Sequence, residues 1–276
     1  MTRALDVPRV LDDKEVDQFW EQGYLLVRGV LSRDEAEHYR RVITDLIPRD
    51  LSIPPHWHVA DGRIKPMRTE HDQTYDIPEL LPLFGNERLY AVAAQLLESP
   101  RLRVFDGSLG VTLRNDASRD RALSQTLHID ASVPATRDNF LFSLEEVQLG
   151  GCFYFTDVLP DGGGIHVVPG GHRRVEEEAR ADAKGRHLHT DWKRITHMDS
   201  VEVTGEAGDF ALVHHLMPHG ASHNRRTQAR VAQFQRYVRT DHPHGVGEPD
   251  DPARYNDLQL AAMSPLTRQL LGIDPW

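Results

Sequence analysis

The segment RLRVFDGSLGVTLRN, residues 101–115, opens a series of strand-like segments that indicates the fold class. Glycine, proline and aspartate residues separate these segments, as expected for strands joined by turns. The further segments are DNFLFSLEEVQLG (138–150), CFYFTDVL (152–159), GIHVVPG (164–170), DSVEVTGEAGDFALVHH (199–215) and RVAQFQRYVRT (230–240). Because the strands follow one another so closely, the pattern predicts a β-barrel or a two-sheet sandwich.

Helical segments precede this β-rich region, and the combination predicts an α+β fold. Asp12 or Asp13 caps the first helix, and Gly23 ends it. Ser32 and Glu35 have the spacing of a capping box at the start of the second helix. The expected elements are helices at 11–24, 32–47 and 87–99, a short buried strand at 24–31, and a closing helix at 264–273.

The length and composition of the chain exclude several classes of protein. Its 276 residues, 39% of them hydrophobic, suit one large β-domain, so we expect residues 1–276 to form a single domain. No apolar run approaches the roughly 20 residues that cross a membrane, and the first residues lack an apolar signal region. The net charge of −10 argues against nucleic-acid binding.

Cys152 is the only cysteine of the chain, so an intrachain disulfide is excluded. This composition fits a reducing compartment, and we expect a cytoplasmic protein in which Cys152 is a small core residue. Two short basic runs, at residues 40–42 and 172–175, are expected to be solvated faces of the surface.

Residues 50–82 are a long loop-like region that includes PPHWHVADGRIKPMRTEHDQTYD (54–76). A segment of this length without secondary structure is usually functional when it lies inside a compact domain. It is interpreted either as a lid, from which we expect substrate contacts, or as a disordered segment. The candidates are His56, Trp57, His58, Lys65, Arg68, His71 and Tyr75.

His128 and Asp130 lie two residues apart in QTLHIDAS (125–132), just after a β-like run. Because residues i and i+2 of a strand point the same way, both side chains can reach one ion. Two histidines and one carboxylate on one face are the ligands of non-haem Fe(II) sites, which keep open positions for a cosubstrate and O2. A distal histidine from another strand would complete such a set.

The segment GDFALVHHLMPHGASHNRRTQAR (208–230) offers four histidines for this third position. They are His214, His215, His219 and His223. We favour His219, which stands where a strand ends, 11 positions (230 − 219) before Arg230. A guanidinium stays protonated and binds carboxylates bidentately, so Arg230 suits the far carboxylate of a dicarboxylate cosubstrate.

Other interpretations of these residues stay open. His128 and Asp130 taken alone could be a satisfied polar pair. His215 and His219 have the spacing of a zinc-binding helix, but the glutamate of H-E-x-x-H is absent and Pro218 would break the helix. A cupin-like, non-catalytic metal-binding or sensing module would use the same three ligands, but it needs no dicarboxylate anchor such as Arg230.

Four stretches of the chain resemble the phytanoyl-CoA dioxygenase family of Fe(II)- and 2-oxoglutarate-dependent oxygenases, which implies a double-stranded β-helix. They are LDDKEVDQFWEQGYLLVRGVLSRDEAEHYR (11–40), LHID (127–130), DVLPDGGGIHVVPGGHR (157–173) and LMPHGASHNRRTQAR (216–230). Together with the strand that follows, they span Leu11 to Val238. A taurine-dioxygenase-like oxygenase would share the three ligands and the arginine, but the first and third stretches fit it less well.

The resemblance implies a role for each matching residue. His128, Asp130 and His219 would bind Fe(II), and Arg230 would anchor 2-oxoglutarate. Asn224 matches an asparagine that the family places between the distal histidine and the arginine. There it would organise the loop or serve as a simple turn residue.

Further residues follow from the same comparison. Thr126 or Gln125 would hydrogen-bond the cosubstrate from the segment before His128. Gly171 stands in PGGHR where serine is usual, a change that a turn should tolerate. Halogenating members lack the carboxylate that Asp130 supplies here, so the resemblance implies no halogenation.

The implied reaction is the oxidation of an unactivated C–H bond by O2, coupled to the conversion of 2-oxoglutarate to succinate and CO2. Hydroxylation is the expected outcome, and substrate placement can divert the same site to desaturation, epoxidation or ring closure. An acyl-CoA would call for a basic patch, and this acidic chain shows no clear one. We therefore expect a small-molecule substrate, either a metabolite or a natural-product intermediate.

Overall fold

The computed structural model describes residues 7–47, 59–60, 63–64, 77–115, 127–130, 147–181, 199–242 and 251–276. A seven-stranded sheet runs in the order β1 (Tyr24–Val27), β8 (Phe210–His214), β5 (Leu149–Tyr154), β10 (Arg230–Arg239), β4 (Leu102–Thr112), β3 (Arg63–Ile64) and β2 (Val59–Ala60). A three-stranded sheet has the order β7 (Val201–Glu202), β6 (Ile165–Val167) and β9 (His219–Ala221). All strand pairings are antiparallel.

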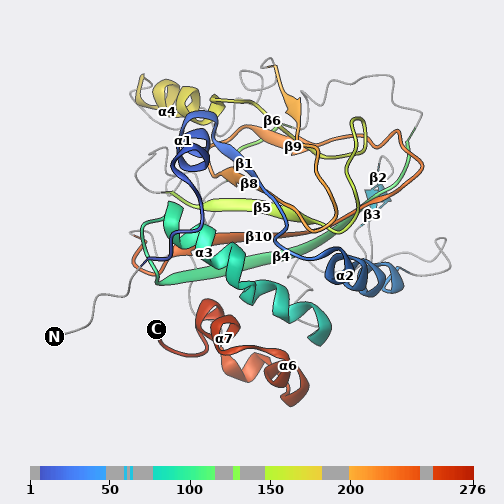
Figure 1. Cartoon of the computed structure of the whole chain (residues 1–276), viewed down its shortest axis with the longest axis vertical. Coiled ribbons are helices and arrows are strands. Elements are labelled where there is room, and N and C mark those ends of the chain that lie inside the picture. The colour runs from blue at the N-terminus through green and yellow to red at the C-terminus, as the bar shows by residue number, and fades with distance from the viewer. Residues whose placement is uncertain are drawn as a thin grey trace.

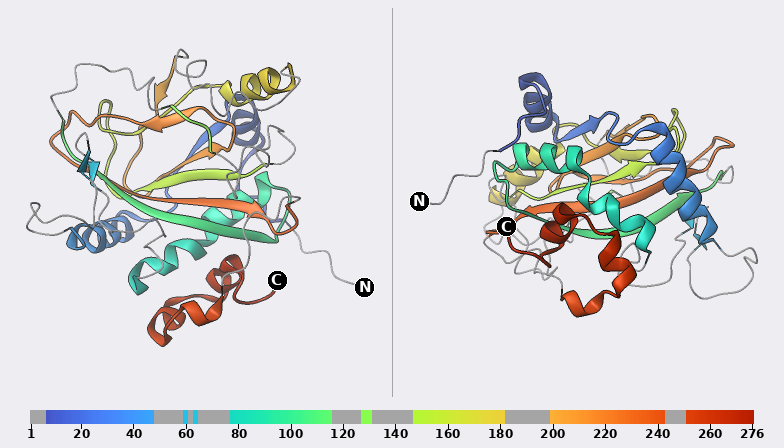
Figure 2. Two further views of the ribbon diagram at one scale, coloured as in Figure 1. Left: turned by 180° about the vertical axis from the view of Figure 1, so that it is seen from behind. Right: turned by 60° about the horizontal axis from the view of Figure 1, so that its bottom comes forward.

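Helices accompany the two sheets. They are α1 (Asp13–Gln22), α2 (Arg33–Asp45), η2 (Pro78–Gly85), α3 (Glu87–Leu96), α4 (Gly171–Ala181), η4 (Pro252–Arg254), α6 (Asp257–Ala262) and α7 (Pro265–Leu271). Figure 1 shows the smaller sheet on one side of the larger sheet and α3, α6 and α7 on the other. The two views of Figure 2 show the same layers from behind and from below. The arrangement confirms the predicted α+β class and is consistent with a double-stranded β-helix.

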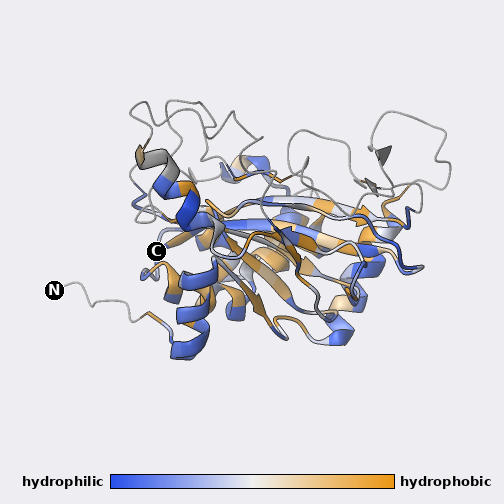
Figure 3. Ribbon diagram, turned by 90° about the horizontal axis from the view of Figure 1, so that it is seen from above, coloured by the Kyte–Doolittle hydropathy of each residue, from blue (hydrophilic) through white to orange (hydrophobic). Residues whose placement is uncertain are grey.

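Two hydrophobic clusters fill the spaces on either side of the larger sheet. The larger cluster joins this sheet to the helices, with Leu149, Phe153 and Phe210 among its members. The smaller one lies between the two sheets and includes Cys152 and Tyr154, which are fully buried. Cys152 is therefore a core residue, as predicted. Hydrophobic residues concentrate in the strands, whereas the outer faces of the helices are largely hydrophilic (Figure 3).

The local signals at the first two helices were predicted correctly. Asp12 caps α1 by accepting a hydrogen bond from the backbone of Glu15, and the Glu15 side chain completes a capping box. Ser32 and Glu35 form the same motif at α2. Gly23 ends α1 in the left-handed conformation, with φ +78°, and its N–H donates to the Phe19 carbonyl.

Replacing Gly23 with alanine is expected to destabilise the protein more than the same change at Gly29. Both glycines are left-handed, with φ of +78° and +60°, which costs an alanine about 1–2 kcal/mol. A Cβ at position 23 would also overlap His172 and Met217, whereas a Cβ at position 29 would meet nothing within 4 Å. Such overpacking typically costs about 1–3 kcal/mol more. Urea unfolding of the two variants measures the difference, and equal midpoints would contradict this packing account.

The prediction of one uninterrupted loop over residues 50–82 is wrong at several positions. Strands β2 and β3 pair with each other, and β3 adds to the edge of β4. The end of the region belongs to η2, where Leu80 and Leu81 are fully buried. The run of apolar residues around Pro82 packs into the core between α2, α6 and α7 instead of lying on the surface.

Helix α4 was not predicted, because its first residues were assigned to a turn and to a solvated basic run. His172 and Val175, three positions apart, are buried on one face of this helix, while Arg173 is exposed and donates to the Trp20 carbonyl. Gly171 begins the helix, and a Cβ there would lie 2.8 Å from Pro218 Cδ. The glycine therefore permits a close approach to the segment that leads into His219, which the sequence pattern did not reveal.

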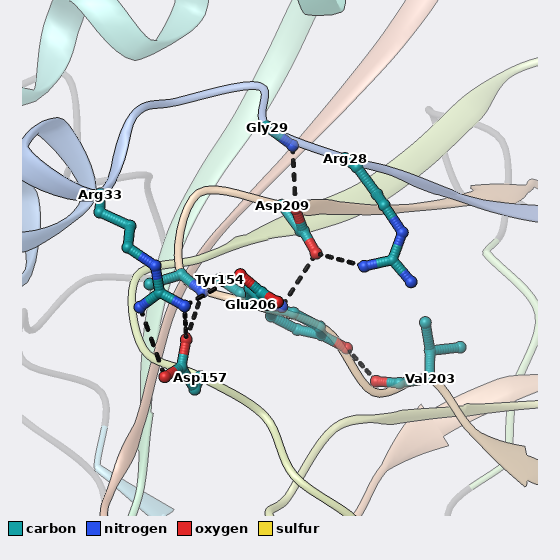
Figure 4. A network of polar contacts seen from close by, with 9 residues as sticks. Arg28, Gly29, Arg33, Tyr154, Asp157, Val203, Glu206 and Asp209 are labelled. Atoms are coloured by element: carbon teal, nitrogen blue, oxygen red, sulfur yellow. Dashed lines mark hydrogen bonds and ion pairs between the residues drawn. The ribbon is translucent and has the colours of Figure 1, made fainter.

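A network of polar contacts joins the start of α2, and the segment between β1 and α2, to the turn before β8 (Figure 4). Asp209, only 4% exposed, accepts from the backbone N–H groups of Gly29 and Glu206 and pairs with Arg28. Arg33 pairs with Glu206 and Asp157. Tyr154 donates to the Val203 carbonyl across the two sheets. These bonds fix the turn that positions β8 in the larger sheet.

Two further comparisons with the sequence concern α3 and the C-terminal end. Helix α3 and helix α7 form as predicted, whereas α6 was not predicted. The Trp276 indole donates to the Leu102 carbonyl and stacks on Tyr90, so the C-terminal segment packs against α3 and β4.

Among the described residues, no helix is both long and apolar enough to span a membrane. The expectation that residues 1–276 form a single domain stays a prediction.

Candidate active site

A cavity of about 300 Å³ lies between the two sheets. Its walls come from β4 and β10 of the larger sheet, from β9 of the smaller sheet, and from the segment 127–130. His128, Asp130, His219 and Arg230 all line it. The fold thus brings together four predicted site residues that are as many as 102 positions (230 − 128) apart in the sequence.

The side chains of His128, Asp130 and His219 converge on one point of the cavity. Their candidate ligand atoms all lie within 4.8 Å of one another. The Asp130 Oδ1 atom is 3.9 Å from His128 Nε2 and 3.8 Å from His219 Nε2. Paired backbone hydrogen bonds hold the two histidine residues opposite each other, from His128 N to the His219 carbonyl and the reverse, at 2.7 and 2.8 Å.

Burial and neighbouring groups set the protonation of the two buried members of this set. Burial lowers the pKa of His219 to about 4, although Asp130 opposes the shift, so the imidazole is neutral at pH 7. Its Nδ1–H donates to the Met217 carbonyl at 2.8 Å, which leaves Nε2 free to bind a metal. Burial by itself would raise the pKa of Asp130, but Arg236 and then the histidines outweigh it and lower that pKa.

Arg230 is buried beside this cluster, with only 3% of its surface exposed. Its Nη2 donates to Thr112 Oγ1 at 3.0 Å, and its guanidinium lies 5.9 Å from the Phe234 ring centroid. Nε and Nη1 have no hydrogen-bond partner within the part of the chain that the structure describes. A buried cation in a cavity wall, with donors left unused among the described residues, suits a carboxylate ligand.

Asn224 lies outside the lining of the cavity, and it is fully buried. Its amide donates to the carbonyls of Thr112 and Gln228, and its Oδ1 accepts from the backbone of Arg226. These bonds join the loop after β9 to the end of β4. They support the interpretation of Asn224 as a residue that organises the loop, and they bring Arg230 next to Thr112.

The remaining predicted contacts lie outside the described residues. These are Gln125, Thr126, Trp57, Lys65 and Arg68, together with the other lid candidates His56, His58, His71 and Tyr75. Of the region predicted as a lid, only Ile64 lines the cavity within the described part of the chain. The lid and its substrate contacts stay predictions.

The other distal histidine candidates lie elsewhere. His214 and His215 are buried and stack on each other, with ring centroids 4.6 Å apart. The Nδ1 of His214 accepts from the Leu216 backbone, and that of His215 accepts from the Gln148 backbone. His223 is half-buried and is not among the three grouped ligands. His215 and His219 do not share a helix, which removes the basis for the zinc-helix alternative.

Sequence reasoning missed two charged residues in the cavity wall, Arg236 and Asp106. Arg236 Nη2 donates to Asp130 Oδ1 at 2.7 Å, and its Nε lies 3.4 Å from Asp106 Oδ2. Arg236 is six positions after Arg230 on the same strand, so side-chain alternation along β10 could have indicated that it faces the same way. No comparable signal marks Asp106.

Solved structures of similar fold cover most of this chain. The epimerase SnoN in complex with Fe3+, α-ketoglutarate and nogalamycin RO has 21% identity and a TM-score of 0.57, with 89% of this chain and 91% of SnoN covered. EvdO2 from Micromonospora carbonacea var. aurantiaca, complexed with 2-oxoglutarate, has 18% identity and a TM-score of 0.57, with 92% and 100% covered. HygX from Streptomyces hygroscopicus, with nickel and 2-oxoglutarate bound, has 16% identity and a TM-score of 0.56, with 84% and 88% covered. These likenesses establish the fold.

No curated protein matches the chain in sequence. The model of the phytanoyl-CoA dioxygenase (PhyH) family does match it, over residues 19–232. The match includes the three grouped ligands and Arg230, and it covers well over half of the chain. The resemblance seen in the sequence is thereby confirmed, and with it the expectation of an enzyme of the 2-oxoglutarate-dependent non-haem iron class. The chain belongs to the phytanoyl-CoA dioxygenase (PhyH) family.

Proposed function

We propose that this protein uses Fe(II), 2-oxoglutarate and O2 to oxidise an unactivated C–H bond of a small metabolite or natural-product intermediate, with release of succinate and CO2. Hydroxylation is the proposed outcome. The observation that carries the proposal is the meeting of His128, Asp130 and His219 with the buried Arg230 in one cavity. A metal-binding set without Arg230 would fit a sensor equally well.

The residues present fit both groups. Two neutral imidazole nitrogens and one carboxylate oxygen are the donors that non-haem Fe(II) sites use while leaving positions open. The unused Nε and Nη1 donors of Arg230 suit the far carboxylate of 2-oxoglutarate. When bound, iron and 2-oxoglutarate would activate O2 for attack on a C–H bond.

The chain's own contribution is to hold and orient these groups. His219 keeps its metal-binding tautomer through the bond to Met217, and Asp130 keeps its negative charge through Arg236. Arg230 fixes the cosubstrate at the end of the cavity near Thr112. Ile165 and Phe234 give the cavity apolar wall surface beside these groups.

The class of substrate draws support from the charge of the chain and from its structural neighbours. The net charge of −10 disfavours a polyanionic acyl-CoA. SnoN and SnoK are described as an epimerase and a carbocyclase from nogalamycin biosynthesis, and HygX has been crystallised with hygromycin B. These names and the bound hygromycin B support a natural-product intermediate as one proposed class of substrate. The expectation that the protein is cytoplasmic, drawn from the sequence, also stays a prediction.

The first test is an anaerobic titration of the metal-free protein with Fe(II) and then with 2-oxoglutarate. We expect a weak visible charge-transfer band when 2-oxoglutarate chelates the bound iron. Iron binding without this band would contradict the cosubstrate assignment and favour a metal-binding or sensing module. Absence of iron binding would contradict the proposal as a whole.

Given the band, a screen for the substrate follows. Succinate is measured after addition of O2 and of candidate small molecules, and the true substrate is expected to increase succinate release above the uncoupled rate. The oxidised product, identified by mass spectrometry, then distinguishes hydroxylation (a gain of one oxygen atom) from desaturation or ring closure (a loss of two hydrogen atoms). Faster succinate release with an acyl-CoA than with small metabolites would contradict the proposed substrate class.

A further inference from the structure

We propose that Arg236, braced by Asp106, is a positioning residue that fixes the orientation of the Asp130 carboxylate for metal binding. The inference rests on the proposed function, since it treats Asp130 as a metal ligand. It gives a role to Arg236 and Asp106, two charged residues of the cavity wall that are neither candidate metal ligands nor the cosubstrate anchor.

The first observation is the contact between Arg236 and Asp130. The Nη2–Oδ1 distance of 2.7 Å is that of a charge-assisted hydrogen bond. The same Oδ1 atom is the one nearest to Nε2 of both His128 and His219. Because a carboxylate oxygen has two lone pairs, Oδ1 can accept from Arg236 and still offer a lone pair on the side of the histidines.

The second observation is that Asp106 holds Arg236 from the other side. Asp106 Oδ2 lies 3.4 Å from Arg236 Nε, so the guanidinium lies between two carboxylates. Asp106 Oδ1 is itself fixed by the backbone N–H and the hydroxyl of Ser108, at 3.1 and 2.7 Å. These contacts run from Ser108 through Asp106 and Arg236 to Asp130, and each group restricts the orientation of the next.

The third observation is the backbone at Asp106. The residue has a φ of +74° and pairs with Gln235 of β10, directly after the register shift that follows the pairing of Gln233 with Leu109. Non-glycine residues adopt this left-handed conformation uncommonly, aspartate more readily than most, and such residues cluster at functional sites. A β-bulge also redirects a side chain, and this one directs the Asp106 carboxylate into the cavity wall.

The fourth observation is the space left for this arrangement. At Gly150 of β5, a Cβ would lie 3.1 Å from Asp130 Oδ2 and 3.8 Å from Arg236 Cγ. The glycine lets both side chains lie flat against the larger sheet. Asp130 and Arg236 are only 12% and 24% exposed, so the ion pair is shielded from the water that weakens surface pairs.

The test replaces Arg236 with lysine and compares it with Arg239→Lys. Lysine keeps the positive charge but lacks the planar fork that contacts two carboxylates at once, so the change removes orientation and not charge. Arg239 is the matched control, because it lies on the same strand and pairs with Asp241 outside the cavity. Asp106→Asn is a second variant that keeps the turn and tolerates the left-handed backbone but weakens the brace on Arg236.

The readouts are Co(II) affinity of the metal-free protein, the visible spectrum of bound Co(II), and the Fe(II)–2-oxoglutarate band. We expect Arg236→Lys to bind Co(II) about 10- to 100-fold more weakly, as is typical when the partner of a metal ligand is lost, and to shift both spectra. Asp106→Asn should change affinity and spectra in the same direction by less. Arg239→Lys should leave both as in the wild type.

The outcomes separate this inference from the proposed function. Failure of the wild-type protein to bind Fe(II) and 2-oxoglutarate would overturn the proposed function, and this inference with it. A wild-type protein that forms the chelate, with Arg236→Lys and Asp106→Asn unchanged in affinity and spectrum, would overturn only the positioning role. If Arg236→Lys does not fold, Asp106→Asn decides by the same readouts.

Discussion

The variant His219→Ala is expected to lose Fe(II) binding and, with it, the 2-oxoglutarate band and succinate release. Only three groups, on His128, Asp130 and His219, are close enough together to hold the ion among the described residues. Loss of even an outer partner of a metal ligand costs about 10- to 100-fold in affinity or activity. Loss of a ligand itself should therefore reduce succinate release by more than about 100-fold.

The matched control for this prediction is His223→Ala. His223 is four positions further along, was a candidate in the sequence, and is not part of the grouped ligands. We expect it to bind iron and 2-oxoglutarate as the wild type does. Isothermal titration with Fe(II) under anaerobic conditions measures both variants. Iron binding lost in His223→Ala and kept in His219→Ala would show that the ligand assignment is wrong.

The variant Arg230→Met is expected to bind iron normally and 2-oxoglutarate poorly. Hydrogen bonds to charged groups contribute about 1.5–3 kcal/mol, and each 1.4 kcal/mol is about tenfold in affinity. The Kd for 2-oxoglutarate should therefore rise about 10- to 100-fold. Titration of the chelate band at a fixed Fe(II) concentration measures this change.

The same substitution should leave the metal-free protein as stable as the wild type, or more stable. Arg230 is 3% exposed, and its Nε and Nη1 lack partners among the described residues, so burying this cation costs free energy that methionine would not cost. Thr112→Val is the control, since it removes the Nη2 partner but keeps the cation, and should weaken 2-oxoglutarate binding by less. Unchanged affinity in Arg230→Met would contradict the anchor role.

The ends of α1 and α2 and most of the strands could be predicted from the sequence because their causes are local. A capping box needs residues three positions apart, and both Asp12 with Glu15 and Ser32 with Glu35 supply it. A left-handed helix end at Gly23 requires only the absence of a Cβ. Strand alternation and turn residues are likewise written into short segments.

The candidate site could be predicted in part for the same reason. His128 and Asp130 share one face because they are two positions apart, and His219 and Arg230 have a spacing that the family resemblance made informative. Its place at an expected strand end, 11 positions before Arg230, selected His219 among four histidines, and the family resemblance implied the same residue. Among the described residues, it is the histidine candidate whose side chain groups with those of His128 and Asp130.

Other features depend on which segments pack together, so they become visible in the folded chain alone. Two prolines, Pro78 and Pro82, make the η2 segment look like a loop, yet its Leu80 and Leu81 are buried. The helices that pack against η2 include α6 and α7, which begin only at residues 257 and 265. Gly171 looks like a turn glycine, but its role is to let α4 approach Pro218.

The pairing of Arg236 with Asp130, across 106 positions, is of this second kind. So is the bulge that turns Asp106 toward Arg236, since a register shift exists only between two paired strands. Local elements, and the types of residue that can bind a metal and a dicarboxylate, follow from the sequence alone. The tertiary structure decided which charged side chains share the low-dielectric cavity, because strand pairing, not sequence distance, sets which charges interact there.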